Sequence, residues 1–61
     1  MLNRDQAFAE MEKGNKIIHF NFTSDEYYHL VNGNIIAEDN VNHTRVFWST
    51  SFMSNGWSIY N

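Results

Sequence analysis

Apolar residues near the start of the chain recur at helical spacing. Phe8 and Met11 lie on one stripe of residues 4–13, and most charged residues of this segment lie outside that stripe. Asn3 stands before the segment and Gln6 follows three residues later, which is the pattern of a capping box at a helix N-terminus. A glycine directly after residue 13 is typical of a helix end. The pattern therefore predicts a helix over residues 4–13 that packs through Phe8 and Met11.

Residues 16–22 combine β-branched and aromatic side chains, a composition typical of a β-strand. Alternate residues of a strand point to opposite faces of the sheet. The more apolar set is expected to face the core and consists of Ile18, Phe20 and Phe22. The other face of this strand carries Ile17, His19 and Asn21.

The dipeptide Asn32-Gly33 separates two apolar segments, 27–31 and 34–38. A two-residue type I′ turn needs positive φ at both positions, which Asn and Gly tolerate best, so the pattern predicts a β-hairpin. Opposed residues share a face, and one face of this hairpin carries Tyr28, Leu30, Ile35 and Ala37. The other face carries Tyr27, His29, Val31 and Ile36. This second set is too apolar for a fully solvated surface, and we expect another surface to cover it.

The last third of the chain contains short segments with different signals. Residues 39–40 are typical of a turn, and residues 44–48 are interpreted as a fourth strand. Residues 49–55 are rich in Ser and Asn, which indicates a loop or a single helical turn. Residues 57–60 are expected to form the last strand.

The predicted strand 44–48 places Phe47 and Trp48 on opposite faces. If Trp48 points inward, Arg45 and Phe47 both point outward, and no charge is buried. We therefore expect Trp48 in the core or at a self-interface, with Arg45, Phe47 and Tyr27 as outward contact residues.

Together these elements predict a single α+β domain over residues 1–61. One N-terminal helix is expected to pack on an antiparallel sheet of four to five short strands. The predicted core includes Phe20, Leu30, Ile35 and Trp57.

Composition narrows the range of functions. The 61 residues carry four Lys or Arg against seven Asp or Glu, and the net charge of −3 makes nucleic acid an unfavourable partner. There is no Cys, so a disulfide framework and a thiolate zinc site are both excluded. The longest apolar runs are two or three residues, which predicts no membrane span.

The sequence contains no recognisable catalytic or metal-binding motif. The three histidines, His19, His29 and His43, do not follow a metal-ligand spacing. The carboxylates and serines also lack the context of catalytic groups. We therefore expect neither an enzyme nor a protein with a cofactor or a structural metal.

Aromatic residues make up 16% of the chain, which is difficult to bury in so small a monomer. Exposed aromatic side chains are common anchors of interfaces. A homo-oligomer is therefore expected, with a dimer as the first choice. The expected interface or partner-binding residues are Tyr27, His29, Ile36, Arg45, Phe47 and Trp48.

The order of three segments resembles short proteins encoded by tailed phages and prophages. These segments are the opening helix 5–11, the step Gly14-Asn15-Lys16 into a strand, and the closing segment 56–60. The layout is also distantly similar to the Thoeris anti-defence family, whose members oligomerise and sequester a cyclic nucleotide signal. The resemblance implies a phage or prophage accessory protein that inhibits a bacterial defence component in the host cytoplasm.

Three functions remain open. The first is a non-enzymatic protein that binds a host protein, and the alternative is an oligomeric sponge for a cyclic nucleotide. The third is a structural or regulatory adaptor. A sponge needs donors for phosphate groups, and the chain offers only four cationic side chains, Arg4, Lys13, Lys16 and Arg45. This scarcity favours the host protein as the partner.

Overall fold

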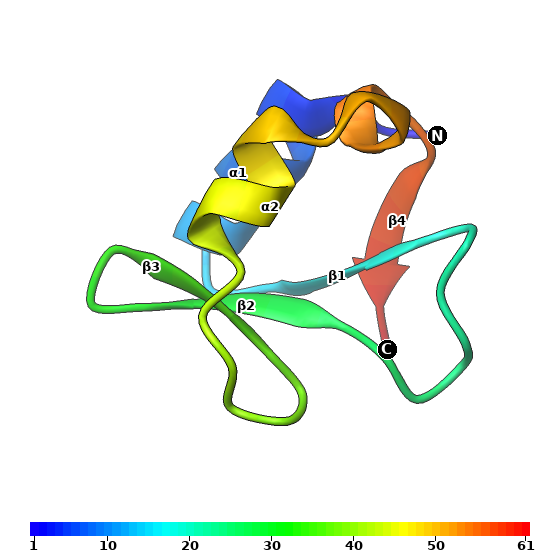
Figure 1. Cartoon of the computed structure of the whole chain (residues 1–61). Helices are drawn as coiled ribbons and strands as arrows, with labels where there is room; N and C mark the ends of the chain where they lie inside the picture. Colours follow the sequence, from blue (N-terminus) through cyan, green and yellow to red (C-terminus); the bar gives the residue numbers. More distant parts are fainter.

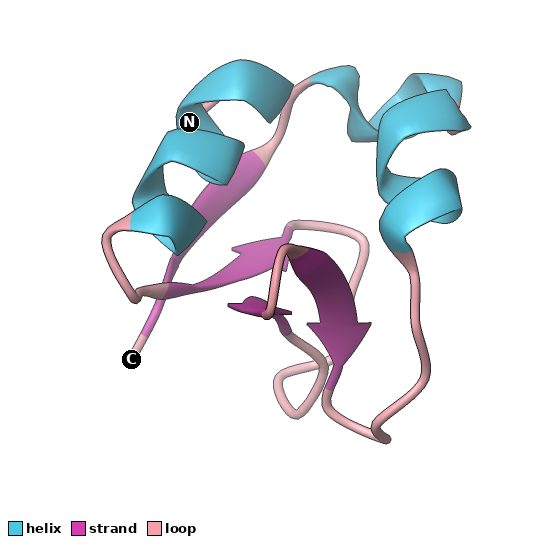
Figure 2. Ribbon diagram, turned by 90° about the vertical axis from the view of Figure 1, so that its left-hand side faces the viewer, coloured by secondary structure: helices cyan, strands magenta, loops and turns pink.

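The computed structural model describes all residues from Met1 to Asn61. Two α-helices and a short 3-10 helix lie on one side of a four-stranded antiparallel sheet (Figures 1 and 2). In chain order the elements are α1 (Arg4–Glu12), β1 (Lys16–His19), β2 (Tyr28–Val31), β3 (Asn34–Ala37), α2 (Thr44–Ser49), η1 (Ser51–Ser54) and β4 (Trp57–Tyr60). The strands are ordered β3-β2-β1-β4. The predicted α+β class, with an N-terminal helix on an antiparallel sheet, is confirmed.

The first helix has the predicted cap. The Asn3 side chain accepts a hydrogen bond from the Gln6 backbone N–H at 2.8 Å, and the Gln6 side chain accepts one from the Asn3 N–H at 2.9 Å. Gly14 follows the helix with φ +97°, a conformation that L side chains rarely adopt. Met11 is buried and Phe8 is half-buried against the core, so α1 packs through the expected stripe.

The hairpin of β2 and β3 is also confirmed. Asn32 and Gly33 both have positive φ, at 50° and 81°, as a type I′ turn requires. The register follows from this turn, and the paired residues are Tyr28–Ala37, His29–Ile36, Leu30–Ile35 and Val31–Asn34.

The first strand differs from the prediction in length and in orientation. β1 ends at His19, and Ile17 and His19 are buried, whereas Phe20 is 65% exposed. Ile17 pairs directly with the buried Tyr28, and this pairing fixes which face of β1 meets the helices. After β1 the chain turns, because the Phe22 N–H donates to the His19 carbonyl at 2.9 Å. The expectation that Phe20 belongs to the core is therefore wrong.

Residues 44–48 form most of α2, not a fourth strand. The helix begins after Asn42, whose side chain accepts a hydrogen bond from the Thr44 N–H at 2.9 Å. Thr44 Oγ1 in turn accepts from the Ile35 N–H at 2.9 Å, which attaches the start of α2 to β3. Aromatic and β-branched residues favour strands only weakly, and packing against the sheet decides the conformation here.

This helix reverses the predicted orientation of its aromatic residues. Phe47 is fully buried, with its ring centroid 5.3 Å from that of Trp57. Trp48 is 42% exposed and does not point into the core. The predicted exposure of Phe47 and the placement of Trp48 in the core are both wrong, because both rested on strand alternation in a segment that is helical. The alternative position of Trp48 at a self-interface stays a prediction.

A side chain of α1 holds the far end of α2. Arg4 Nε donates to the Phe47 carbonyl oxygen at 2.9 Å, and its Nη2 donates to the Thr50 carbonyl oxygen. These carbonyls lie at the C-terminal end of α2, where a positive charge is favourable. Arg4 therefore joins the two helices on their common side of the sheet.

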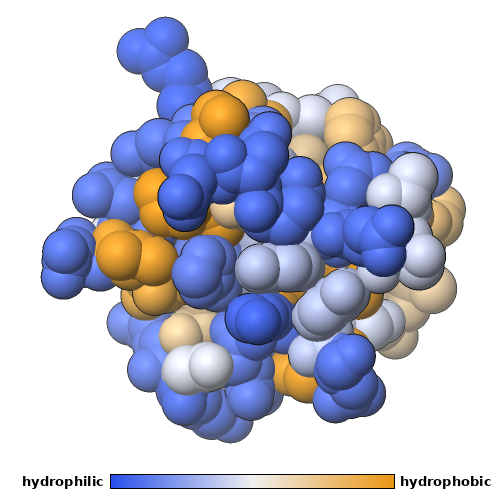
Figure 3. Space-filling view, turned by 90° about the horizontal axis from the view of Figure 1, so that it is seen from below, coloured by the Kyte–Doolittle hydropathy of each residue, from blue (hydrophilic) through white to orange (hydrophobic).

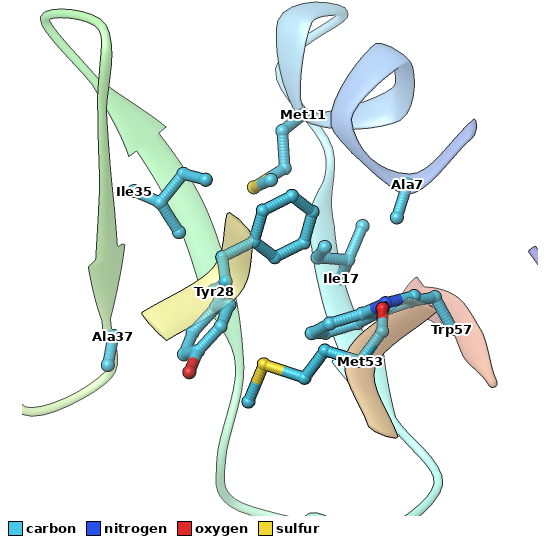
Figure 4. Close-up of a cluster of buried hydrophobic side chains, with 9 residues drawn as sticks. Ala7, Met11, Ile17, Tyr28, Ile35, Ala37, Met53 and Trp57 are labelled. Atoms are coloured by element: carbon cyan, nitrogen blue, oxygen red, sulfur yellow. The ribbon is translucent and has the colours of Figure 1, made fainter. Parts of the chain in front are cut away.

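One hydrophobic core lies between the helices and the sheet (Figure 4). Trp57 is its largest side chain, and Trp57 Nε1 donates to the Met53 carbonyl oxygen at 2.7 Å. Ile35 and Trp57 are core residues as predicted, and Leu30 packs against them while half-buried. The buried hydrophobic residues are Ala7, Met11, Ile17, Tyr28, Ile35, Ala37, Phe47, Met53 and Trp57.

Short segments cover both outer edges of the sheet. Leu2 exchanges two hydrogen bonds with Trp57 on β4, at 2.8 and 3.0 Å. On the other edge, the Ala37 N–H donates to Val41 at 2.9 Å and the His43 N–H donates to Ile35 at 2.8 Å. Neither edge therefore offers a free row of backbone groups along its whole length.

Candidate functional site

The face of the sheet opposite the helices is not covered by any element of the chain (Figures 1 and 2). We call it the open face, and its residues are Lys16, Ile18, Tyr27, His29, Val31, Ile36, Ser58 and Tyr60. Most of its aromatic and aliphatic side chains are half-buried by their neighbours on the face. Viewed from below, the molecule shows apolar patches interspersed with hydrophilic atoms (Figure 3).

Three rings on the open face contact one another. The ring centroids of Tyr27 and Tyr60 are 4.9 Å apart, and those of Tyr27 and His29 are 5.6 Å apart. Lys16 Nζ lies 4.7 Å from the centroid of the Tyr27 ring, a cation–π contact. The face therefore presents a packed aromatic cluster with a positive charge beside it.

An acidic residue lies next to the same cluster. Glu38 directly follows β3, and its carboxylate accepts a hydrogen bond from the Tyr27 N–H at 3.3 Å. Glu38 and Lys16 are both exposed. The charged groups of the open face thus have opposite signs and lie on opposite sides of β2.

A second candidate surface lies on α2. Arg45 and Trp48 are three residues apart, so they share the outer side of this helix. The Trp48 ring rests on Phe8 of α1, with centroids 5.1 Å apart, and on the edge of the buried Phe47 at 4.9 Å. These contacts position a large, partly exposed aromatic ring, and Arg45 lies about one helical turn before it.

The structure separates the predicted site residues into three groups. Tyr27, His29 and Ile36 lie together on the open face, since His29 pairs directly with Ile36. Arg45 and Trp48 belong to the surface of α2. Phe47 lies in the core, so its predicted role as an outward contact residue is wrong.

Sequence reasoning missed four residues of the open face, Lys16, Ile18, Ser58 and Tyr60. The error in the orientation of β1 placed Ile18 in the core. Ile59 pairs with the buried Ile17, so the neighbouring pair of Lys16 and Tyr60 points away from the helices. For β4 the sequence does contain a signal. Trp57 and Ile59 alternate with Ser58 and Tyr60, which predicts that the last two share the face away from the core.

His19 has a structural environment at one end of the sheet. It is 1% exposed, and its Nε2 lies 2.7 Å from the Asn55 carbonyl oxygen and 3.0 Å from that of Phe52. Its Nδ1 accepts a hydrogen bond from the Asn21 N–H at 3.1 Å. This pattern assigns the proton to Nε2, and both ring nitrogens are then occupied by backbone groups.

Tyr28 and His43 form a further buried polar contact. The Tyr28 hydroxyl lies 3.1 Å from His43 Nδ1, where the helix α2 begins. Burial, reinforced by the nearby carboxylates of Glu26, Glu38 and Asp39, raises the pKa of Tyr28 to about 12. This hydroxyl therefore stays neutral and hydrogen-bonded over the physiological range.

Other exposed apolar side chains lie outside these two surfaces, among them Phe20 and Phe52, which are 65% and 52% exposed. No three His, Asp or Glu side chains are grouped to hold a metal ion, and no pocket is present. Neither α-helix has the length and apolar character that crossing a membrane requires. Comparisons of the chain with protein-family models, curated proteins and solved structures find no match.

Proposed function

We propose that this chain is a non-enzymatic phage or prophage accessory protein that binds a bacterial defence protein in the host cytoplasm and blocks it. The phage origin and the class of target rest on the resemblance of the sequence. The structural observation that supports protein binding is the exposed Trp48, held beside Arg45 on the outer side of α2.

Tryptophan and arginine are the residues most enriched among those that dominate the energy of protein interfaces. The Trp48 ring is already positioned by Phe8 and Phe47, so little side-chain freedom is lost when a partner covers it. A flat surface of this kind fits another protein better than it fits a small ligand, which needs a concave site.

The proposed state of the protein is a homodimer. Its two α2 surfaces would then act as two copies of the partner-binding site. Because the open face and α2 lie on opposite sides of the sheet, self-association through the open face leaves Trp48 and Arg45 accessible.

The first test is affinity capture from a bacterial lysate with the tagged chain and its Trp48→Ala and Arg45→Ala variants. We expect the wild type to retain a defence protein, and each variant to bind it at least about tenfold more weakly, since truncating an anchor residue costs about 1–2 kcal/mol or more. Val41→Ala is the matched control, because Val41 is 50% exposed but lies at the edge of β3.

The captured protein must then be inhibited by the purified chain in its own activity assay. Capture that is unchanged in Trp48→Ala, or a retained protein that the chain does not inhibit, contradicts the proposal. Tight binding of a cyclic nucleotide in calorimetry would replace it with the sponge function.

A further inference from the structure

The open face carries more apolar side chains than is usual for a sheet face exposed to solvent, and no segment of the chain covers it. Strand addition is hindered along β3, which pairs with residues 41–43, and at the first residue of β4, which pairs with Leu2. The apolar side chains lie on the face of the sheet and not on its edges, so a second molecule that buries them must meet the face.

The charges of the open face are arranged in a self-complementary way. Ile17 on β1 and Ala37 on β3 both pair with Tyr28 on β2. Because both pairings are antiparallel, Lys16 on one side of β2 lies level with His29, and Glu38 on the other side lies level with Tyr27. The midpoint between Lys16 and Glu38 consequently lies over β2, between Tyr27 and His29.

We propose that a second copy of this chain covers the open face. The two copies are related by a twofold axis that runs parallel to the sheet, above β2 between Tyr27 and His29, and perpendicular to the line from Lys16 to Glu38. In a twofold contact, residue i of one copy meets residue j of the other and the reverse also holds. Lys16 then lies opposite the partner's Glu38, and Glu38 lies opposite the partner's Lys16. The inference rests on the dimer of the proposed function and assigns its interface.

The same arrangement brings apolar groups together at the centre. Tyr27 and His29 lie beside the axis, and Ile36 and Ile18 lie on the two sides of them. The two ion pairs are at the rim, where charges set orientation and specificity more than affinity.

The area of the face determines how stable this dimer is. Four strands about 4.8 Å apart and four residues long span roughly 19 by 14 Å, which gives on the order of 300 Å² per copy. Two copies together bury less than the roughly 1,200–2,000 Å² of a standard stable interface. The dimer is therefore reversible and dissociates on dilution.

The first measurement is the mass of the full chain by sedimentation equilibrium across a concentration series. We expect the average mass to rise from the 7.2 kDa of the monomer toward twice that value as the concentration increases to about 1 mM. A mass that stays at 7.2 kDa throughout overturns the proposal.

The second measurement uses charge reversal. Lys16→Glu places two glutamates opposite each other at both rim contacts, and Glu38→Lys places two lysines there. Each variant alone should dimerise at least about tenfold more weakly than the wild type. An equimolar mixture of the two should recover dimerisation, because both contacts in the mixed dimer again join opposite charges.

Two controls match the charge changes. Lys13→Glu and Glu12→Lys make the same reversals at the exposed end of α1, on the other side of the sheet, and should leave the dimer and the mixture unchanged. Circular dichroism of every variant confirms that the fold is retained.

The outcomes separate this interface from the proposed function. Dimerisation that is insensitive to Lys16→Glu and Glu38→Lys, or that the mixture does not recover, overturns the assigned interface. Partner capture tests the α2 surface independently, because each charge-reversed chain keeps Trp48 and Arg45.

Discussion

At the scale of single residues, His19 is a buried polar side chain whose hydrogen bonds make its burial possible in so small a protein. Its ring contacts Phe20, Phe22, Phe52 and Trp57, and its two nitrogens bond three backbone groups from two loops. A buried polar group is stable when each of its donors and acceptors has a partner. His19 therefore connects the end of β1 to both the turn 20–22 and the segment 52–55.

We predict that His19→Leu lowers the free energy of unfolding by about 2–4 kcal/mol, because it removes these bonds and leaves buried backbone groups without partners. Urea denaturation at low micromolar concentration measures the change. His29→Leu on the open face is the control and should change the stability of the monomer by less than about 1 kcal/mol. Equal losses in the two variants would show that the bonds of His19 do not stabilise the fold.

The raised pKa of Tyr28 makes the stability of the fold depend on pH in the alkaline range. An unfolded tyrosine ionises near pH ~10, whereas the pKa of Tyr28 in the fold is about 12. Its contribution to stability is complete below the unfolded pKa and is lost as the pH rises through the interval between the two values.

The expected result is that wild-type stability falls faster than that of Tyr28→Phe as the pH rises above about 10. The variant loses the hydrogen bond to His43 at every pH but has no buried hydroxyl to ionise. Urea midpoints of both proteins from pH 8 to the alkaline limit measure this difference, and parallel curves would contradict it. All other side chains are the same in both proteins, so their effects cancel in the comparison.

At the scale of elements, the segments that the sequence predicts well are those with local signals. The cap of α1 depends on Asn3 and Gln6, and the hairpin depends on Asn32-Gly33, so neither needs information about the rest of the chain. The orientation of β1 and the helical state of residues 44–49 depend on contacts with distant elements.

The same distinction applies to the candidate site. The Asn32-Gly33 turn sets the hairpin register, so the sequence alone predicts that Tyr27, His29 and Ile36 share one face. Lys16 and Tyr60 join this face only through the pairing of β1 with β4, which are far apart in the sequence. The positions of Phe47 and Trp48 could not be deduced from strand alternation, since the segment follows helical periodicity.

Arg4 provides a test of how α1 and α2 depend on each other. Arg4→Ala removes the donors to the Phe47 and Thr50 carbonyls and should lower the free energy of unfolding by about 1–3 kcal/mol. Arg4→Lys should recover only part of this loss, because lysine lacks the planar group that reaches two carbonyls. Arg45→Ala is the control, since the Arg45 side chain makes no hydrogen bond, and little change in its urea midpoint is expected. A similar loss in Arg45→Ala would assign the effect to helix charge and not to the bonds of Arg4.

At the scale of the whole molecule, the core is small. Eleven of the 61 residues are buried, and one aromatic cluster around Trp57 connects the helices to the sheet. A domain of this length has a total stability of roughly 3–9 kcal/mol. A single large cavity therefore removes much of it.

We predict that Phe47→Ala, which costs about 3–5 kcal/mol, lowers the midpoint of thermal unfolding much more than Trp48→Ala does. The two residues are adjacent in sequence, so the comparison tests burial alone. Circular dichroism during thermal unfolding measures both variants, and similar midpoints would contradict the assigned positions.

The pairing of Leu2 with Trp57 has a consequence for the solubility of the chain. Without the first two residues, the backbone groups of Trp57 that bond Leu2 would face solvent at the end of a sheet whose other edge is already paired. An unprotected strand edge is a template for further chains, which add to it without limit and lead to fibrils. Leu2, which also packs against the core, thus shortens the free edge of β4, and we expect its removal to promote aggregation.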